Sequence, residues 1–193
     1  MVNKLHPNYE CPFDTALYRV IDPHLEAYHR VGVTPNILTT MNLVCGTASA
    51  YNILLHNYAF ASILYATAYY FDCADGKLAR KYGNVTVFGD YYDHIVDTVR
   101  SVFVFGALYI TNPERFMDFS LVLIGLFIAM KMHLGLQETV YKNATSSFLS
   151  MNKWWIRKEW DHKRMIQFSR FFGCGTKNVF IFFMILLWGT VPL

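Results

Sequence analysis

Long apolar stretches alternate with short polar ones along most of this 193-residue chain. A helix of about 20 apolar residues is long enough to cross the hydrocarbon core of a bilayer, and flanking turns can lengthen a shorter stretch. The pattern therefore predicts an all-α fold, a polytopic transmembrane helix bundle with five clear spans at residues 36–56, 58–74, 95–111, 116–132 and 179–193.

The N-terminal part of the chain has a different pattern. Residues 1–33 mix apolar and charged side chains without a long apolar run. This mixture is typical of an amphipathic helix that lies in the membrane interface, and Pro23 is expected to break or kink that helix. We therefore expect one membrane domain over 1–193, with an interfacial segment at 1–33 and the transmembrane bundle at 34–193.

Composition and charge agree with a membrane protein. The chain is 54% hydrophobic and only 16% charged, outside the usual range for a soluble domain. Of its 17 Lys and Arg residues, 15 lie before residue 36, between 76 and 89, or between 131 and 177. Because cytoplasmic flanks carry the positive excess, these segments are expected to face the cytosol. The Trp-rich stretch 152–164 is expected to lie at the membrane surface or else to be a solvated loop.

This orientation predicts a multi-pass membrane protein whose polar site faces the cytosol. The membrane would be the endoplasmic reticulum or another internal membrane in a eukaryote or virus, and the inner membrane in a bacterium. The expected partners include the lipid bilayer, and no nucleic acid.

Acidic residues interrupt two of the predicted spans. A charge at the centre of a membrane helix costs about 2.5–3.5 kcal/mol, so a compensating partner is expected. At helical spacing, Asp72 and Asp75 share one face, and Asp93 and Asp97 share a face of the next helix. Because a short loop joins the two helices, these faces can meet. Four carboxylates would then form a cage suited to Mg²⁺ or Mn²⁺, with room for two ions.

Small and basic residues frame these carboxylates. Gly76 and Gly89 leave space where a phosphate or nucleotide approaches the backbone, and Arg80 can fork onto phosphate oxygens. The residues therefore predict a site for metal and diphosphate. Asp90 lies outside the pattern and is expected at a helix end or facing water.

These positions resemble a family signature without a gap or mismatch: Asp72-x2-Asp75-Gly76-x2-Ala79-Arg80-x8-Gly89-x3-Asp93-x3-Asp97. The signature is that of the CDP-alcohol phosphotransferases, also called CDP-alcohol phosphatidyltransferases, of class I. VTPNILT, at 33–39, resembles the PNxxT element that opens the family's first span. The resemblance implies an integral membrane transferase of phospholipid biosynthesis, which moves a substituted phosphate group from a CDP-alcohol to an acceptor hydroxyl and releases CMP.

The resemblance also implies roles for individual residues. The metal ligands would be Asp72, Asp75, Asp93 and Asp97. Asp97 would also be the general base toward the acceptor hydroxyl. The CDP moiety would be bound by Asn36, Thr39, Asp75, Gly76, Ala79, Arg80 and Gly89.

Two further residues keep alternative roles. His94 directly follows Asp93, a pair that resembles the choline and ethanolamine branch of the family. His94 is therefore a second candidate base, or else a simple polar neighbour. Arg100, one turn beyond Asp97, could pair with that carboxylate or meet an acceptor phosphate. The donor would be CDP-diacylglycerol, slightly preferred, or CDP-choline or CDP-ethanolamine, with a lipid or polyol acceptor.

The span count departs from the family norm. Family members usually have six spans, so a sixth helix is expected to be absent or to be an unusual one within 138–177. A homodimer is a further expectation, since dimers are common in the family. Two other functions stay open: a Mg-dependent membrane prenyltransferase, and a catalytically inactive divalent-cation-binding membrane protein, such as a carrier or scaffold.

Overall fold

A computed structural model describes residues 8–140, 156–157, 159 and 161–190. Every regular element in these ranges is helical, which confirms the predicted all-α class. The elements are α1 (Pro12–Arg30), α2 (Pro35–Leu54), α3 (Tyr58–Tyr82), α4 (Val87–Thr111), α5 (Pro113–Val140), α6 (His162–Ser169), the 3-10 helix η2 (Arg170–Phe172) and α7 (Cys174–Leu186).

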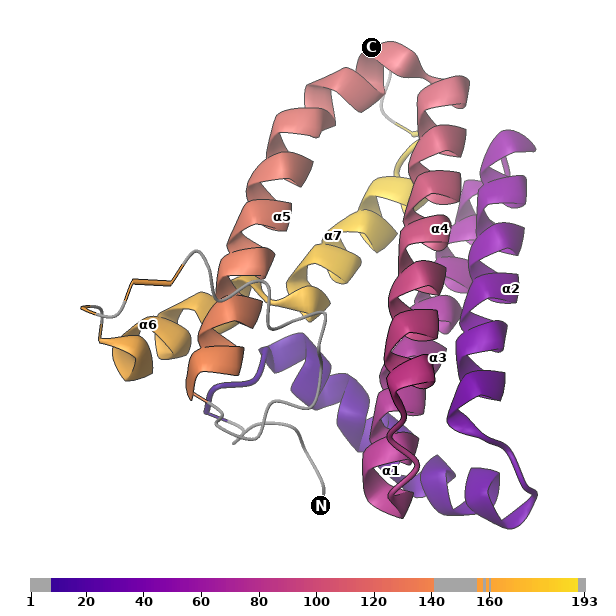
Figure 1. The fold of residues 1–193 in the computed structure, drawn as a ribbon. Helices are drawn as coiled ribbons and strands as arrows, with labels where there is room; N and C mark the ends of the chain where they lie inside the picture. The colour runs from indigo at the N-terminus through magenta and orange to yellow at the C-terminus, as the bar shows by residue number, and fades with distance from the viewer. Residues whose placement is uncertain (1–7, 141–155, 158, 160, 191–193) are drawn as a thin grey trace.

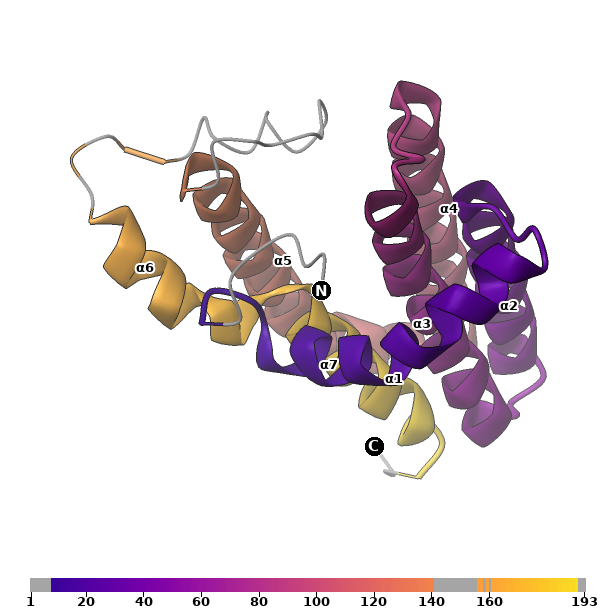
Figure 2. The same ribbon diagram turned by 90° about the horizontal axis from the view of Figure 1, so that it is seen from below.

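Three long helices form the centre of the fold. α2 packs against both α3 and α4, and α7 packs against α3 (Figure 1). α5 meets α4 at their connection and diverges from it toward the other end (Figure 1). α1 runs across that other end, from α7 to α2, as the view from below shows (Figure 2). The polar faces of α3 and α4 therefore lie near the end of the bundle that α1 crosses.

Local signals at the α3–α4 connection place these two helices. Gly83 adopts a left-handed conformation, φ 72°, and ends α3, as glycine commonly does at a helix C-terminus. Thr86 then caps α4, because its Oγ1 accepts a hydrogen bond from the Gly89 amide at 3.0 Å. A short connection between two capped ends makes α3 and α4 consecutive in the chain. α2 packs against both of them, whereas α3 and α4 have little direct packing with each other.

Two apolar clusters hold the helices together. The larger one joins α2, α3, α4 and α7 through residues such as Ile53, Leu108 and Ile185. The smaller one includes Ile21 and Leu25 and seats α1 against α2 and α3. Because Ile21 and Leu25 are anchored on either side of Pro23, α1 continues through this proline. The expectation that Pro23 breaks the helix is therefore wrong.

Helix ends differ from the predicted apolar runs. α3 continues to Tyr82 rather than residue 74, and α4 begins at Val87 rather than 95. Both helices pass through their aspartates because the backbone hydrogen bonds of a helix do not depend on the polarity of its side chains. α5 likewise extends the run 116–132 at both ends.

Among the described residues, two helices, α4 and α5, are both long and apolar enough to cross a membrane. α7 has 13 residues, or about 20 Å, against a hydrocarbon core of about 30 Å. Membrane character thus has support at two of the five predicted spans. Within 138–177, the described part includes only the end of α5, the short α6 and η2, and the start of α7. Most of the segment 152–164 lies outside the described residues.

Candidate active site

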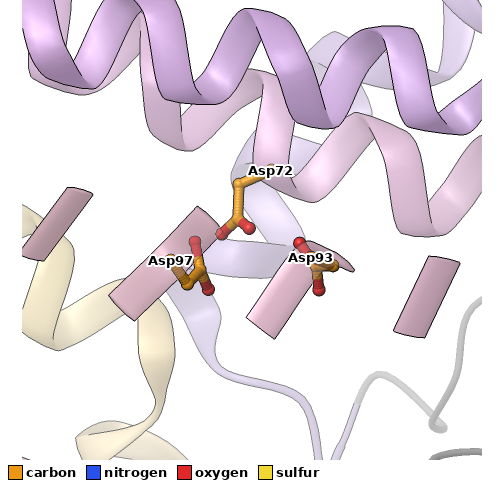
Figure 3. Close-up of side chains that lie close together, drawn as sticks. All are labelled: Asp72, Asp93 and Asp97. Carbon is orange, nitrogen blue, oxygen red and sulfur yellow. The ribbon is translucent and has the colours of Figure 1, made fainter. Parts of the chain in front are cut away.

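Three carboxylates meet between α3 and α4. Asp72 comes from α3, and Asp93 and Asp97 come from α4 (Figure 3). One oxygen from each lies within 4.8 Å of the other two. The Asp93 Oδ1 atom is buried and has no hydrogen-bond partner among the described residues. Hard oxygen donors at this spacing, one of them unsatisfied, fit a divalent cation such as Mg²⁺ or Mn²⁺.

Asp75, the fourth predicted ligand, takes another position. Its carboxylate is not part of the three-carboxylate group. It is 4% exposed, and its Oδ2 accepts a hydrogen bond from Thr39 Oγ1 of α2 at 2.5 Å. Side chains three positions apart on a helix point in directions that differ by about 60°. Asp75 therefore faces α2 while Asp72 faces α4. The structure thus brings three of the four predicted carboxylates together.

Asp97 is held from behind by two polar side chains. Its Oδ1 accepts from Asn42 Nδ2 of α2 at 3.2 Å and pairs with Arg100 Nη2 at 3.0 Å. Arg100 is 2% exposed, and neither cavity of the site includes it in its lining. Of its two expected roles, the structure shows the pairing of Arg100 with Asp97; the contact with an acceptor phosphate stays a prediction.

The seven residues predicted to bind the CDP moiety line one cavity of about 160 Å³ between α2, α3 and α4. Asn36 and Thr39 come from the start of α2, and Gly89 from the start of α4. The other four lie on the last turns of α3: Asp75, Gly76, Ala79 and Arg80. The structure therefore assembles this predicted set in one place.

Glycines make room in this cavity for other polar groups. A Cβ on Gly76 would lie 3.1 Å from Arg80 Nη1, so the guanidinium lies over this glycine. A Cβ on Gly89 would lie 3.4 Å from Asn36 Oδ1. The Arg80 Nε atom is buried without a hydrogen-bond partner in the part of the chain described. An unsatisfied guanidinium in a glycine-lined cavity fits a phosphate.

A second cavity, of about 480 Å³, extends from the carboxylates toward α5 and α7. The two cavities share Asp93, His94 and Arg80, so they are parts of one continuous site. Lys131 and Lys177 bring positive charge to the far side of the second one.

α1 closes part of the second cavity. Asp14 accepts hydrogen bonds from the Tyr69 hydroxyl and, at 3.2 Å, from the Gly175 amide. Burial raises the pKa of the Asp14 carboxyl above its ordinary value, against the opposing effect of these hydrogen bonds. Asp14 therefore ties α1 to the start of α7 at the edge of the site.

His94 lies among acidic neighbours at the junction of the two cavities. Its Nδ1 is 3.6 Å from Asp93 Oδ2, and its Nε2 is 3.9 Å from Asp90 Oδ1. Asp90 lies in the first turn of α4, as expected of a helix-end residue, and it also lines the first cavity. The position of Asp90 in the cavity lining was not predicted from the sequence.

The sequence profile of the CDP-alcohol phosphatidyltransferases matches residues 32–192. This chain belongs to that family. It is 30% identical over 98 residues to an archaetidylinositol phosphate synthase of Pyrococcus horikoshii, covering 51% of this chain and 52% of the relative. It is 27% identical over 108 residues to an uncharacterized protein of Aquifex aeolicus, covering 56% and 51%. The alignments span about half the length of these curated relatives, and no solved structure matches significantly.

Asn42 is the main residue of this family member's site that the sequence reasoning did not single out. It lies inside the apolar run 36–56 and is fully buried against Asp97. A polar amide within a predicted span is a usable signal, because such residues are rare and usually have partners. Its partner, however, lies 55 positions away and could not be identified from spacing.

Proposed function

We propose that this family member is an integral membrane transferase of phospholipid synthesis. It transfers a substituted phosphate group from a CDP-alcohol to an acceptor hydroxyl and releases CMP. The observation that carries the proposal is the single cavity that contains all seven predicted CDP-binding residues and borders the three-carboxylate group.

The carboxylates supply the proposed cofactor site. Asp72, Asp93 and Asp97 would hold Mg²⁺ or Mn²⁺, and Asp75, which lines the second cavity together with these three, would contribute to a two-ion arrangement. When bound, such ions neutralise diphosphate charge and make the attacked phosphorus more electrophilic. The buried, unpartnered oxygen of Asp93 supports this assignment.

The chain's own residues bind the donor and move the proton. Arg80 binds the diphosphate above Gly76, and Asn36 approaches from α2 beside Gly89. Asp97 takes the proton of the acceptor hydroxyl, whose oxygen bonds to the phosphorus that carries the donor alcohol. The bond from that phosphorus to CMP breaks, and CMP leaves with the electron pair. His94 is the alternative base.

The preferred donor is CDP-diacylglycerol or a similar CDP-linked lipid, with a polyol acceptor. The archaetidylinositol phosphate synthase among the relatives favours this choice over CDP-choline or CDP-ethanolamine. The second cavity, with Lys131 and Lys177 on its far side, provides space for the acceptor next to the carboxylates.

The proposed setting is a multi-pass protein in an internal membrane or a bacterial inner membrane, with its site toward the cytosol. The long apolar helices α4 and α5 and the basic segments around the site end of the bundle support this orientation. A homodimer is part of the same proposal.

The test is CMP release by the purified protein in lipid, with Mg²⁺ or Mn²⁺ and labelled CDP-diacylglycerol or CDP-choline, across a panel of polyol and lipid acceptors. The Asp93→Asn variant serves as the inactive control. Failure of every donor and acceptor pair would refute the transferase. Pyrophosphate release from a prenyl donor would indicate a prenyltransferase instead, and Mn²⁺ binding without any turnover would indicate an inactive cation-binding protein.

A further inference from the structure

A closed triangle of polar side chains lies behind the carboxylates and joins α2 to α4. Asn42 donates from Nδ2 to Asp97 Oδ1 at 3.2 Å and accepts at Oδ1 from Arg100 Nη1 at 2.8 Å. Arg100 Nη2 completes the triangle by pairing with Asp97 Oδ1 at 3.0 Å. Asn42 is 0% exposed and is absent from the lining of both cavities. It therefore acts on the site through Asp97 and not by touching a substrate.

The Arg100 side chain reaches this triangle through a gap that exists only because residue 46 is glycine. A Cβ on Gly46 would lie 2.5 Å from Arg100 Cγ and 2.9 Å from Cδ. Beyond this gap, the guanidinium lies 5.8 Å from the centre of the Tyr65 ring. Tyr65 in turn donates to Asn178 of α7 at 2.6 Å. Because Gly46 lies one turn after Asn42, a single face of α2 supplies both the amide and the gap.

This arrangement fixes the direction of one particular carboxylate. Both partners bind the same oxygen of Asp97, Oδ1. In Figure 3, one carboxylate oxygen of Asp97 points toward Asp72. Arg100 alone, three residues along the same helix, would already provide a counter-charge. The hydrogen bond from Asn42 also fixes the position of Asp97 relative to α2, the helix that carries Asn36 and Thr39 of the first cavity.

We infer that Asn42 is a positioning residue for the proposed transfer, with Gly46 and Arg100 as its support. Together they hold Oδ1 of Asp97, so that the carboxylate keeps its direction toward Asp72 and Asp93 and its position relative to the nucleotide cavity. The inference rests on the proposed function, in which Asp97 is a metal ligand and the base.

The sharpest test is Gly46→Ala, because it changes none of the three polar residues and acts on the triangle by displacing the Arg100 side chain. Its matched control is Gly106→Ala on α4, where an added Cβ would meet nothing within 4 Å. We expect Gly46→Ala to lower kcat about 10- to 100-fold, since a shift of about 1 Å in a reacting group has this effect. The donor KM should change less than about threefold, because the nucleotide cavity is intact. Gly106→Ala should keep both values.

A second readout does not depend on turnover. Mn²⁺ binding, measured by electron paramagnetic resonance of the free ion, should weaken about tenfold in Gly46→Ala and not in the control, as expected when a residue that orients a metal ligand is disturbed. Asn42→Asp provides a second variant. It keeps a partner for Arg100, which favours folding, but it replaces the bond to Asp97 with repulsion and should lower both kcat and Mn²⁺ affinity.

A purely structural role gives a different result. Gly46→Ala and Asn42→Asp would then lower the unfolding temperature while the folded protein kept wild-type kcat and Mn²⁺ affinity, and this outcome would overturn the inference. If the wild-type protein releases no CMP with any substrate pair, the transferase proposal fails. The Mn²⁺ comparison still decides the role of Asn42 in that case.

Discussion

Asp97→Asn separates the two candidate bases, Asp97 and His94. The substitution keeps the shape of the side chain, and an amide oxygen can still accept from Asn42 and Arg100 at the 3.2 Å and 3.0 Å seen for the carboxylate. The α2–α4 contact should therefore survive. What is lost is the negative charge and the ability to take a proton from the acceptor hydroxyl.

The expected loss can be estimated from these roles. A positioned general base contributes about 10²- to 10⁴-fold, or about 2.7–5.4 kcal/mol of barrier. Asp97 is absent from the lining of the nucleotide cavity, so the affinity for the CDP-alcohol should change little. His94 lines that cavity and contacts Asp90 and Asp93. His94→Gln should therefore mainly raise the donor KM and leave kcat within about tenfold of wild type.

The assay is single-turnover CMP release, together with donor binding, over a range of Mn²⁺ concentrations. If excess Mn²⁺ restores Asp97→Asn, the lost function is metal binding; if it does not, the lost function is proton transfer. The reasoning is refuted if Asp97→Asn keeps a kcat within about tenfold of wild type while His94→Gln loses 100-fold or more, on the scale expected for a base.

Two further predictions concern nucleotide binding and stability. Arg80→Lys keeps the positive charge but removes the two-pronged guanidinium above Gly76, so the donor KM should rise about 10- to 100-fold with a smaller change in kcat. Steady-state kinetics at saturating acceptor measure both values. An unchanged donor KM would contradict a phosphate contact of Arg80. Gly175→Ala would place a Cβ 2.7 Å from Asp14 Oδ1 and 2.9 Å from the Asp14 backbone nitrogen, so α1 and α7 must separate. We expect the free energy of unfolding to fall by about 1–3 kcal/mol, which would lower the unfolding temperature in detergent by several degrees. The control is Gly125→Ala, which has open space around it and should not destabilise the protein. Equal stability of the two variants would contradict the tight α1–α7 contact.

Much of the candidate site could be predicted because it is built from local spacing. Asp93 and Asp97 lie one helical turn apart and face the same way in any helix. Gly76 and Arg80 have the same relation on the preceding helix. Short-range rules therefore predicted which of these residues share one face of the same helix.

Other features depend on how the helices pack. The rotation of α3 places Asp72 against α4 and Asp75 against Thr39, which spacing alone could not distinguish. The partnership of Asn42 with Asp97 joins residues far apart in the chain, as does the bond from Asp14 to Gly175. The apolar runs were shorter than the helices, because a run stops at the first charged residues whereas the backbone hydrogen bonds of a helix continue past them. The helical spacing of the aspartates had already indicated that α3 and α4 extend through them.

The sequence by itself determined the helical class and which residues share one face of a helix, such as Asp93 with Asp97, because both follow from helical periodicity. The residues around the nucleotide cavity were expected from the resemblance to the family signature. Only the tertiary structure decided which carboxylates group together, why Arg100 is buried and what orients Asp97. These depend on the rotation and close approach of α2 at Gly46, a property of the packed helices that no single segment contains.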